Sequence, residues 1–320
     1  MDDVYLTYLD GNVHFFYGET EFYSDKARIN DRKKTAELEG NVEVYEDTLA
    51  LYADKVKYFR EKELIILRNN VFLKETHRDS TIRTFEAKEV DYLREKKIIE
   101  ARDSVYAYDE RENIHGYCGF LKYNQLEGYG YLIKKPIVYL ESKDSLSLES
   151  EKIEYFDQYE KIVATFDVTT TYQKMKIYSD FAIFLKSEDR AIFLGEPEFH
   201  ADLADAYSKR MQMFFNDDQI EKAILTDSSR VNFTAEENAL KDNWITSDKM
   251  DITFIENRIN SCEAFENVSS HYKKEKSKKI DFSINDTQGD YLKIIMDNEN
   301  EVDMIKLKNN VKGVYKFKNK

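Results

Sequence analysis

A short pattern of alternating apolar residues recurs eight times along the chain, and it restricts the fold more than any other feature of the sequence. Each copy places mostly apolar residues two positions before a small anchor residue and again three and five positions after it, as in "LYADKVKY" at 51–58. Apolar side chains at every second position are typical of a strand with one buried face. The anchors are 29 to 39 residues apart: Ser24, Ala53, Ala87, Cys118, Ser150, Ser179, Ser208 and Ser247.

The alternation shifts by one position between the anchor and the next apolar residue. One additional residue in a strand bends the chain while the same face stays inward, as in a β-bulge. Each copy is followed by a charged turn, a second alternating strand and another corner, such as Gly40-Asn41-Val42 or Asn69-Asn70-Val71. Glycine and asparagine tolerate the left-handed backbone that such corners often need. The repeat therefore predicts an all-β chain with strands of about 8–10 residues and almost no helix.

The inward positions of the repeats form the candidate binding surface. We expect charged neighbours such as Lys55, Lys57, Glu89 and Glu154 to face outward, because they occupy the opposite phase of the alternation. The alternation alone does not distinguish a filled core from a cavity that binds a ligand. The candidate interior residues are Phe22, Leu51, Val56, Tyr58, Ile65, Val71, Phe85, Val90, Tyr92, Leu121, Tyr123, Ile153, Tyr155 and Phe184.

Composition excludes several classes of protein. The net charge of −14 makes nucleic acid an improbable partner, since phosphate binding needs a basic surface. Cys118 and Cys262 fit no metal or redox spacing, and a disulfide between them stays open. The chain has no run of 18 apolar residues, and its start, "MDDVYLTYLD", does not have the pattern of a signal peptide. An exported protein would therefore have lost its signal peptide before this sequence begins.

We find no catalytic motif and predict neither a catalytic residue nor a cofactor. The 62 Asp and Glu residues fall in turns or on outward phases, which is typical of a solvated surface. The sequence contains no G-x-S-x-G, H-E-x-x-H, P-loop or G-x-G-x-x-G motif. The segment "HADLAD" at 200–205 offers one histidine and two aspartates, which occur more often on a surface loop than around a metal. The sequence therefore predicts a protein that is not an enzyme and holds no metal.

The motif "ADK-x-x-Y … K-x-A-x-x-x-GNV-x-V" resembles the OstA/LptA family of lipopolysaccharide-transport proteins, and most closely its OstA-like branch. The resemblance covers about residues 10–240 well and the remainder weakly. It implies an elongated antiparallel β-jellyroll, open along one side like a folded taco, with the same fold as the periplasmic part of LptD. It also implies a periplasmic module that carries lipopolysaccharide towards the outer membrane and shields the acyl chains in an apolar lumen. The candidate interior residues would then line that lumen.

The domain prediction is one continuous body, with regular repeats over 1–240 and longer, less regular repeats over 241–320. The resemblance implies that copies of this fold join end to end by strand pairing. The N-terminal edge, residues 4–19, is strongly β-forming and carries few charges, so we expect it to accept a same-fold partner. The C-terminal "KGVYKFKNK" is lysine-rich and would be protected from such pairing.

Two alternative functions stay open at the level of sequence. A rigid β-scaffold of an envelope complex would have the same repeat with a filled core. A right-handed β-helix enzyme acting on a polysaccharide would also repeat at 20–30 residues, but its strands would pair in parallel. Strand direction and the packing of the interior distinguish these alternatives from the transport module.

Overall fold

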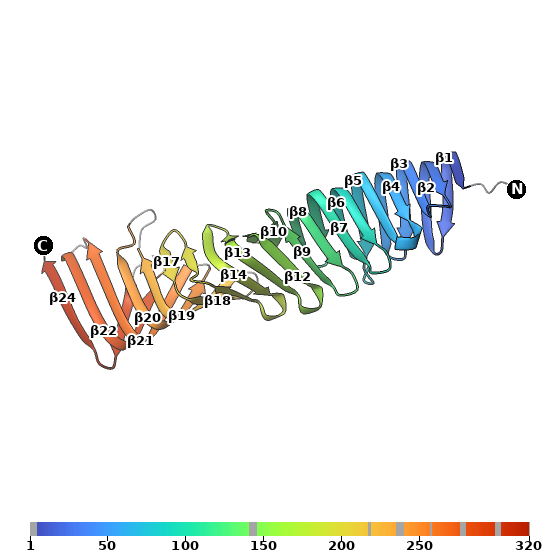
Figure 1. Cartoon of the computed structure of the whole chain (residues 1–320). Helices are drawn as coiled ribbons and strands as arrows, with labels where there is room; N and C mark the ends of the chain where they lie inside the picture. The colour runs from blue at the N-terminus through green and yellow to red at the C-terminus, as the bar shows by residue number, and fades with distance from the viewer. Residues whose placement is uncertain are drawn as a thin grey trace. The chain divides into compact units, whose positions relative to one another are not determined.

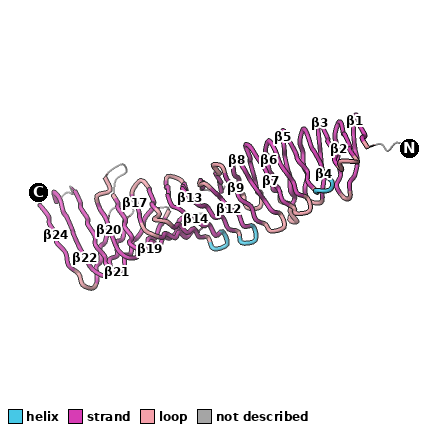
Figure 2. The backbone as a smooth tube through the Cα atoms, viewed as in Figure 1, coloured by secondary structure: helices cyan, strands magenta, loops and turns pink. Residues whose placement is uncertain are grey.

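The chain is built almost wholly of antiparallel strands. The computed structural model describes residues 5–140, 146–216, 219–234, 240–256, 258–275, 280–297 and 302–319. These residues form 24 strands and three single-turn 3₁₀-helices (Figures 1 and 2). The ladders between the described strands are antiparallel, from β1–β2 through to β22–β24. The predicted all-β antiparallel class is confirmed, and the alternative of a parallel β-helix is wrong.

Two compact units make up the chain. Unit 1 comprises Met1–Ser142 and Glu149–Tyr159, and unit 2 comprises Lys143–Leu148 and Glu160–Lys320. The sequence did not indicate this division. The prediction that the repeats become longer and less regular after residue 240 refers to their spacing in the sequence. It stays a prediction.

Unit 1 contains eleven complete strands. They form a largely sequential stack, as Figure 1 shows. Its elements are β1 (Leu6–Tyr17), β2 (Thr20–Asn30), β3 (Thr35–Glu46), β4 (Leu49–Phe59), η1 (Arg60–Lys62), β5 (Leu64–Thr76), β6 (Ile82–Leu93), β7 (Ile98–Asp109), β8 (Ile114–Asn124), β9 (Tyr129–Ile133), β10 (Ile137–Leu140), β12 (Lys152–Phe156) and η2 (Asp157–Tyr159). The short strands β9 and β10 both pair with β8, and β12 pairs with β9.

Unit 2 continues the antiparallel pattern with more interruptions and, near its end, longer strands. Its elements are β11 (Leu146–Glu149), β13 (Lys161–Tyr172), β14 (Met175–Leu185), η3 (Lys186–Glu188), β15 (Arg190–Leu194), β16 (Glu198–His200), β17 (Ala204–Tyr207), β18 (Arg210–Asn216), β19 (Gln219–Phe233), β20 (Asn243–Ile255), β21 (Arg258–Glu275), β22 (Ile280–Met296), β23 (Val302–Lys308) and β24 (Lys312–Asn319).

Each regular strand bends at the predicted corner without ending there. The ladder register shifts at this point, for example between Glu39 and Val42 of β3. The strands β2 to β8 therefore have 11 to 13 residues, longer than the predicted 8–10, because the bulge bends the strand but does not interrupt it. The left-handed backbone is found as predicted, with φ of 81° at Gly40 and 44° at Asn41.

Two recurring hydrogen bonds explain the residue types at the corners. The amide of Asn41 donates to Asp25 on the neighbouring strand at 3.0 Å, and Asn70 donates to Asp54 at 2.9 Å. The small anchor is explained where it is serine, because the hydroxyl donates to the carbonyl two residues later and satisfies a backbone acceptor at the bulge. This bond recurs at Ser24, Ser150, Ser179, Ser208 and Ser247.

Because each strand bends, its two halves belong to two facing walls. Successive hairpin turns alternate between the walls. In unit 1, the turns of wall A are at 18–19, 47–48, 77–81 and 110–113, and those of wall B are at 31–34, 60–63, 94–97 and 125–128. The rings of Phe22 on wall A and Tyr58 on wall B lie 5.4 Å apart, and those of Phe85 on wall A and Tyr123 on wall B lie 5.9 Å apart. The walls therefore contact each other through their inward side chains. We call the side opposite the corners, where the turns lie, the mouth.

Candidate functional site

The predicted interior residues lie in the interior, almost without exception. Thirteen of the fourteen are buried, from Phe22, Leu51 and Tyr58 at 0% exposure to Phe184 at 8%, and Tyr155 is half-buried. Lys55 and Lys57 pair with Glu39 and Glu37 of the neighbouring strand, each at 2.7 Å and on the outer face. The period-two phase and its shift at the corner are therefore confirmed. Contact of these residues with a lipid stays a prediction.

In unit 1, ionic contacts join the two walls across the mouth. Glu46 at the end of a wall A half-strand accepts a hydrogen bond from Arg94 Nε at 2.6 Å and pairs with Lys97 at 2.6 Å. Both basic residues lie in the wall B turn at 94–97. Arg94 also donates to Thr20 of wall A and pairs with Glu63 of wall B. These contacts close the mouth over the buried rings of Tyr58 and Tyr92.

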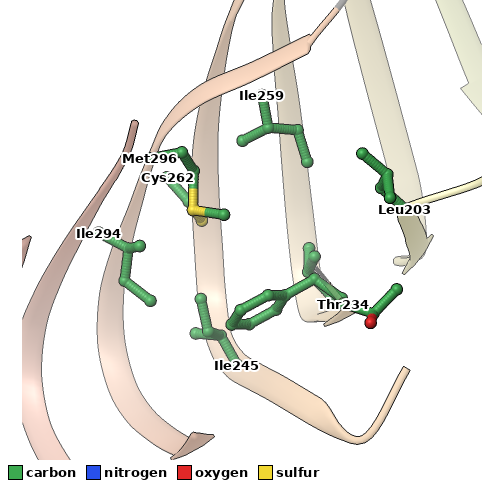
Figure 3. A pocket seen from close by; sticks show the side chains of 9 residues that line it. Leu203, Thr234, Ile245, Ile259, Cys262, Ile294 and Met296 are labelled. Atoms are coloured by element: carbon green, nitrogen blue, oxygen red, sulfur yellow. The ribbon is translucent and has the colours of Figure 1, made fainter. Parts of the chain in front are cut away.

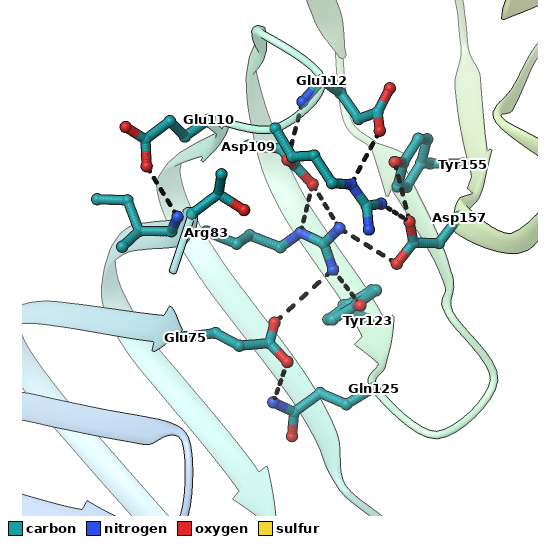
Figure 4. Close-up of polar contacts among 12 residues, drawn as sticks. Glu75, Arg83, Asp109, Glu110, Glu112, Tyr123, Gln125, Tyr155 and Asp157 are labelled. Carbon is teal, nitrogen blue, oxygen red and sulfur yellow. Dashed lines mark hydrogen bonds and ion pairs between the residues drawn. The ribbon is translucent and has the colours of Figure 1, made fainter. Parts of the chain in front are cut away.

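A second ionic cluster closes the mouth further along unit 1 (Figure 4). Arg83 of wall A is 4% exposed, donates to Asp109 Oδ2 at 2.8 Å through Nε and donates to the hydroxyl of Tyr123 on wall B. Its guanidinium also lies 3.4 Å from Asp157 of wall B, and Arg111 of wall A pairs with the same carboxylate. Gln125 of wall B donates to Glu75 of wall A at 2.9 Å. The walls are thus held together by charged and polar side chains that come from four different turns.

These contacts make the closure of unit 1 dependent on pH. Burial opposes ionisation of the Glu46 carboxyl, but the hydrogen bonds and charges of Arg94 and Lys97 outweigh it, so the pKa of Glu46 lies below its ordinary 4.5. At Asp157, burial is likewise outweighed by Arg83 and Arg111, and its pKa is lowered from 3.8. A carboxyl whose folded pKa is depressed stabilises the fold above the unfolded pKa and loses that contribution as pH falls through the folded pKa.

We therefore expect the free energy of unfolding of unit 1 to fall as pH is lowered from about 5 towards 3. Glu46→Gln should be less stable than the parent at pH 7 and should show a shallower decline in this range, because it removes one of the depressed carboxyls. Urea denaturation at a series of pH values measures both effects. Glu95→Gln is the control, since Glu95 is exposed in the same turn. Equal pH profiles for Glu46→Gln and the parent would contradict the assignment.

Among the described residues of unit 2, apolar side chains meet across the mouth. Within unit 2 taken by itself, we call wall A the wall whose turns are at 173–174 and 201–203, and wall B the wall whose turn is at 186–189. Tyr172 of wall A meets Phe215 of wall B edge to face, with ring centroids 6.4 Å apart. The ion pairs Lys222–Asp251, Lys293–Glu263 and Lys241–Asp205 each link side chains within one wall.

An apolar cavity of about 50 Å³ lies at the mouth of unit 2 (Figure 3). Its side chains converge from both walls, as Figure 3 shows, and among the lining side chains Thr234 carries a hydroxyl and Cys262 a thiol, while the others are apolar. Leu203, Ile259 and Met296 are half-buried at the lip, whereas the deeper residues are buried. Wall A contributes Leu203, Val231, Phe233, Thr234 and Ile245, and wall B contributes Ile259, Cys262, Ile294 and Met296.

Neither the ionic mouth of unit 1 nor the cavity of unit 2 was predicted from the sequence, and the prediction that acidic residues lie in turns or on outward phases is wrong for Glu75 and Asp109, which are buried. A signal for the first was present, because Glu46, Glu75, Arg83 and Asp109 continue the inward phase to the ends of their strands. A charged residue in an inward phase needs a partner, but the alternation does not say which distant strand supplies it. Nothing in the repeat pattern distinguished the residues that line the cavity from ordinary core.

Among the described residues, the segment 200–205 forms no metal site and the two cysteines form no disulfide. His200 lies 3.0 Å from Asp205 and 3.4 Å from Glu198, and within the described ranges no group of three or more His, Cys, Asp or Glu side chains could hold a metal ion. Cys118 and Cys262 are free and buried, so no disulfide joins them. Burial raises the pKa of each thiol to about 12. No helix among the described residues has the length and hydrophobicity to cross a membrane.

Comparison with known proteins supports the predicted resemblance. Residues 21–161 match the family described as "LptA/(LptD N-terminal domain) LPS transport protein", which confirms the resemblance over that segment. Among solved structures, the chain is similar to LptH from Pseudomonas aeruginosa, described as the LptA-homologous periplasmic component of the lipopolysaccharide transport device. The identity is 13%, the match covers 48% of this chain and 94% of LptH, and the TM-score is 0.30. No curated protein matches the chain.

Proposed function

From the match of residues 21–161 to the LptA/LptD N-terminal family, we propose that this chain is a periplasmic module of lipopolysaccharide transport. It acts without catalysis, by shielding acyl chains between its two walls on the way to the outer membrane. The candidate interior residues, from Phe22 to Phe184, would contact the acyl chains once the two walls have separated. The family match carries this proposal, and the apolar facing walls support it.

The physical basis is the transfer of acyl chains from water to an apolar surface. Each buried methylene contributes about 0.8 kcal/mol, so a chain of a dozen carbons binds strongly without a polar contact. The interior offers such a surface from both walls, as in the lining by Phe233 and Ile245 on one side and Ile294 on the other. The anionic head group stays in solvent outside the mouth. It is therefore not held against a protein whose net charge is −14.

A rigid scaffold is the second candidate, and one observation favours it for unit 1. Its interior is filled, with Leu51, Ile65, Leu67 and Leu73 at 0% exposure, and its mouth is joined by ion pairs. An acyl chain enters unit 1 only if the walls separate and these contacts break. The two functions differ in whether lipid accompanies the protein.

Native mass spectrometry of the protein extracted from its own envelope tests the proposal. We expect a mass shift that corresponds to bound lipopolysaccharide or a related acylated lipid. Purified lipopolysaccharide added to the delipidated protein should restore the same shift. Protein that carries no lipid after extraction and takes up none in solution would favour the scaffold and contradict the transport function.

Assembly with same-fold partners through the N-terminal edge belongs to the same proposal. Among the described strands, β2 is the one that pairs with β1, and β1 exposes Tyr8 at 68% and Phe16 at 63%. Exposed backbone beside apolar side chains suits strand addition. The C-terminal strand β24 also exposes Tyr315 and Phe317, at 57% and 56%, so lysine protects this edge less than the sequence predicts.

A photo-crosslinking amino acid at Tyr8 measures this association directly. We expect it to capture a same-fold protein of the transport chain, and a crosslinker at Phe166, which is exposed on unit 2, should not. Equal capture at both positions would contradict docking at the N-terminal edge.

A further inference from the structure

The two mouths differ in chemistry, and the difference points to where an acyl chain enters. Crossing the mouth of unit 1 requires breaking the contacts of Glu46 with Arg94 and Lys97, and those around Arg83. Removing one partner of a buried ion pair leaves an uncompensated charge, which is strongly unfavourable. An apolar chain cannot replace any of these contacts, because it offers no hydrogen bond. Unit 1 therefore opposes entry.

At the cavity of unit 2, the described side chains that face each other across the mouth are mainly apolar. Leu203 on wall A and Ile259 and Met296 on wall B form the lip, and an acyl chain would offer these side chains contacts with its methylenes. Methionine adapts its shape more readily than branched side chains, because it is unbranched and flexible. The cavity of about 50 Å³ is smaller than an acyl chain, so the chain must widen it by moving these half-buried residues.

We propose that the cavity lined by Leu203, Phe233, Ile245, Ile259, Cys262 and Met296 is the entry site for a single fatty acyl chain, and that unit 1 is not. This inference rests on the proposed function, since it locates the first step of lipid binding. The occupant is an uncharged hydrocarbon chain because the lining residues carry no charged side chain and, of these side chains, only Thr234 and Cys262 bear a hydroxyl or thiol. An acidic or basic peptide would find no partner for its charges there.

The native cysteines provide a direct test, because each reports on one unit. Cys262 lines the cavity of unit 2 and is 6% exposed, and Cys118 is 7% exposed inside unit 1. The full-length protein is treated with methyl methanethiosulfonate, with and without myristic acid below its micelle concentration. The modification rate of each thiol is followed by peptide mass spectrometry. We expect myristic acid to slow modification of Cys262 at least fivefold and to change the rate at Cys118 less than twofold.

A matched pair of variants provides a second readout that is independent of the thiols. Met296→Lys places a charge at the lip and should weaken myristic acid binding at least tenfold. Met304→Lys makes the same change on β23, where Met304 is 38% exposed and does not line the cavity, and should leave binding unchanged. Circular dichroism and urea denaturation establish that both variants are folded.

The outcomes separate this inference from the function on which it rests. Myristic acid that binds, as measured by native mass spectrometry, but protects Cys118 as much as Cys262 overturns the entry site and leaves lipid transport standing. Equal binding of myristic acid by Met296→Lys and Met304→Lys would also overturn the entry site and leave lipid transport standing. Failure of the parent protein to bind either myristic acid or lipopolysaccharide overturns both proposals. Selective protection of Cys262 together with the selective loss in Met296→Lys supports the entry site.

Discussion

Replacing Arg83 by methionine should lower the free energy of unfolding of unit 1 by about 3–5 kcal/mol. Methionine approximates the length and packing of the arginine stem but leaves the carboxylates of Asp109 and Asp157 without the guanidinium between them. The hydroxyl of Tyr123 also loses its donor. The large value follows from burial, because Arg83 is 4% exposed and water cannot replace the lost partner.

Lys57→Met is the matched control for this prediction. Lys57 pairs with Glu37 at 2.7 Å, but both side chains are more than 40% exposed, so the loss should be within about 1 kcal/mol. Urea denaturation gives the free energies, and hydrogen exchange of peptides from unit 1 and unit 2 shows which unit is affected. A loss for Arg83→Met no larger than for Lys57→Met would mean that the cluster does not hold the mouth of unit 1 closed.

Replacing Phe22 by alanine should cost about 3–5 kcal/mol of stability in unit 1. Phe22 is fully buried, and its ring stacks against Phe15 at 4.9 Å and Tyr58 at 5.4 Å. Truncation removes these contacts and leaves a cavity between the walls, which the stacked strands cannot collapse to fill. The loss therefore includes both the transfer free energy of the ring and the cost of the void.

The control is Phe16→Ala in the same hairpin. Phe16 is 63% exposed, so its removal should change stability by about 0.5 kcal/mol or less. Thermal or urea unfolding of the two variants under the same conditions gives the comparison. A cost below about 1 kcal/mol for Phe22→Ala would indicate a loosely packed interior, which would favour an open lumen in unit 1 over the closed state described here.

Features that depend only on a strand and its neighbours could be predicted from the sequence. The inward phase of Leu51, Val56 and Tyr58 was predicted correctly, because burial of one face leaves only one acceptable register. The left-handed corner at Gly40-Asn41 was predicted from residue type, because glycine and asparagine tolerate this backbone. Strand lengths were underestimated, because a strand such as β3 continues for 12 residues through the predicted bend.

Features that depend on distant strands were not predictable. Arg83 and Asp157 are 74 residues apart in sequence, and no periodicity relates them. The cavity in unit 2 depends on how well side chains such as Leu203 and Met296 fill the mouth, and alternation of apolar residues contains no measure of fit. The division into two units likewise depends on the density of contacts, which the repeat spacing does not reflect.

The corner contacts have a consequence for how such a chain can change length in evolution. Asn41 bonds to Asp25 and Asn70 to Asp54, so each corner is completed by the strand immediately before it. A duplicated segment of about 30 residues would bring its own corner, turn and inward side chains, and repeat proteins tolerate such additions because each repeat contacts mainly its neighbours. A single inserted residue within a half-strand would instead turn every following side chain of that half to the opposite face. Whole repeats are therefore the natural unit of gain and loss in this molecule, and its half-strands should resist any smaller change.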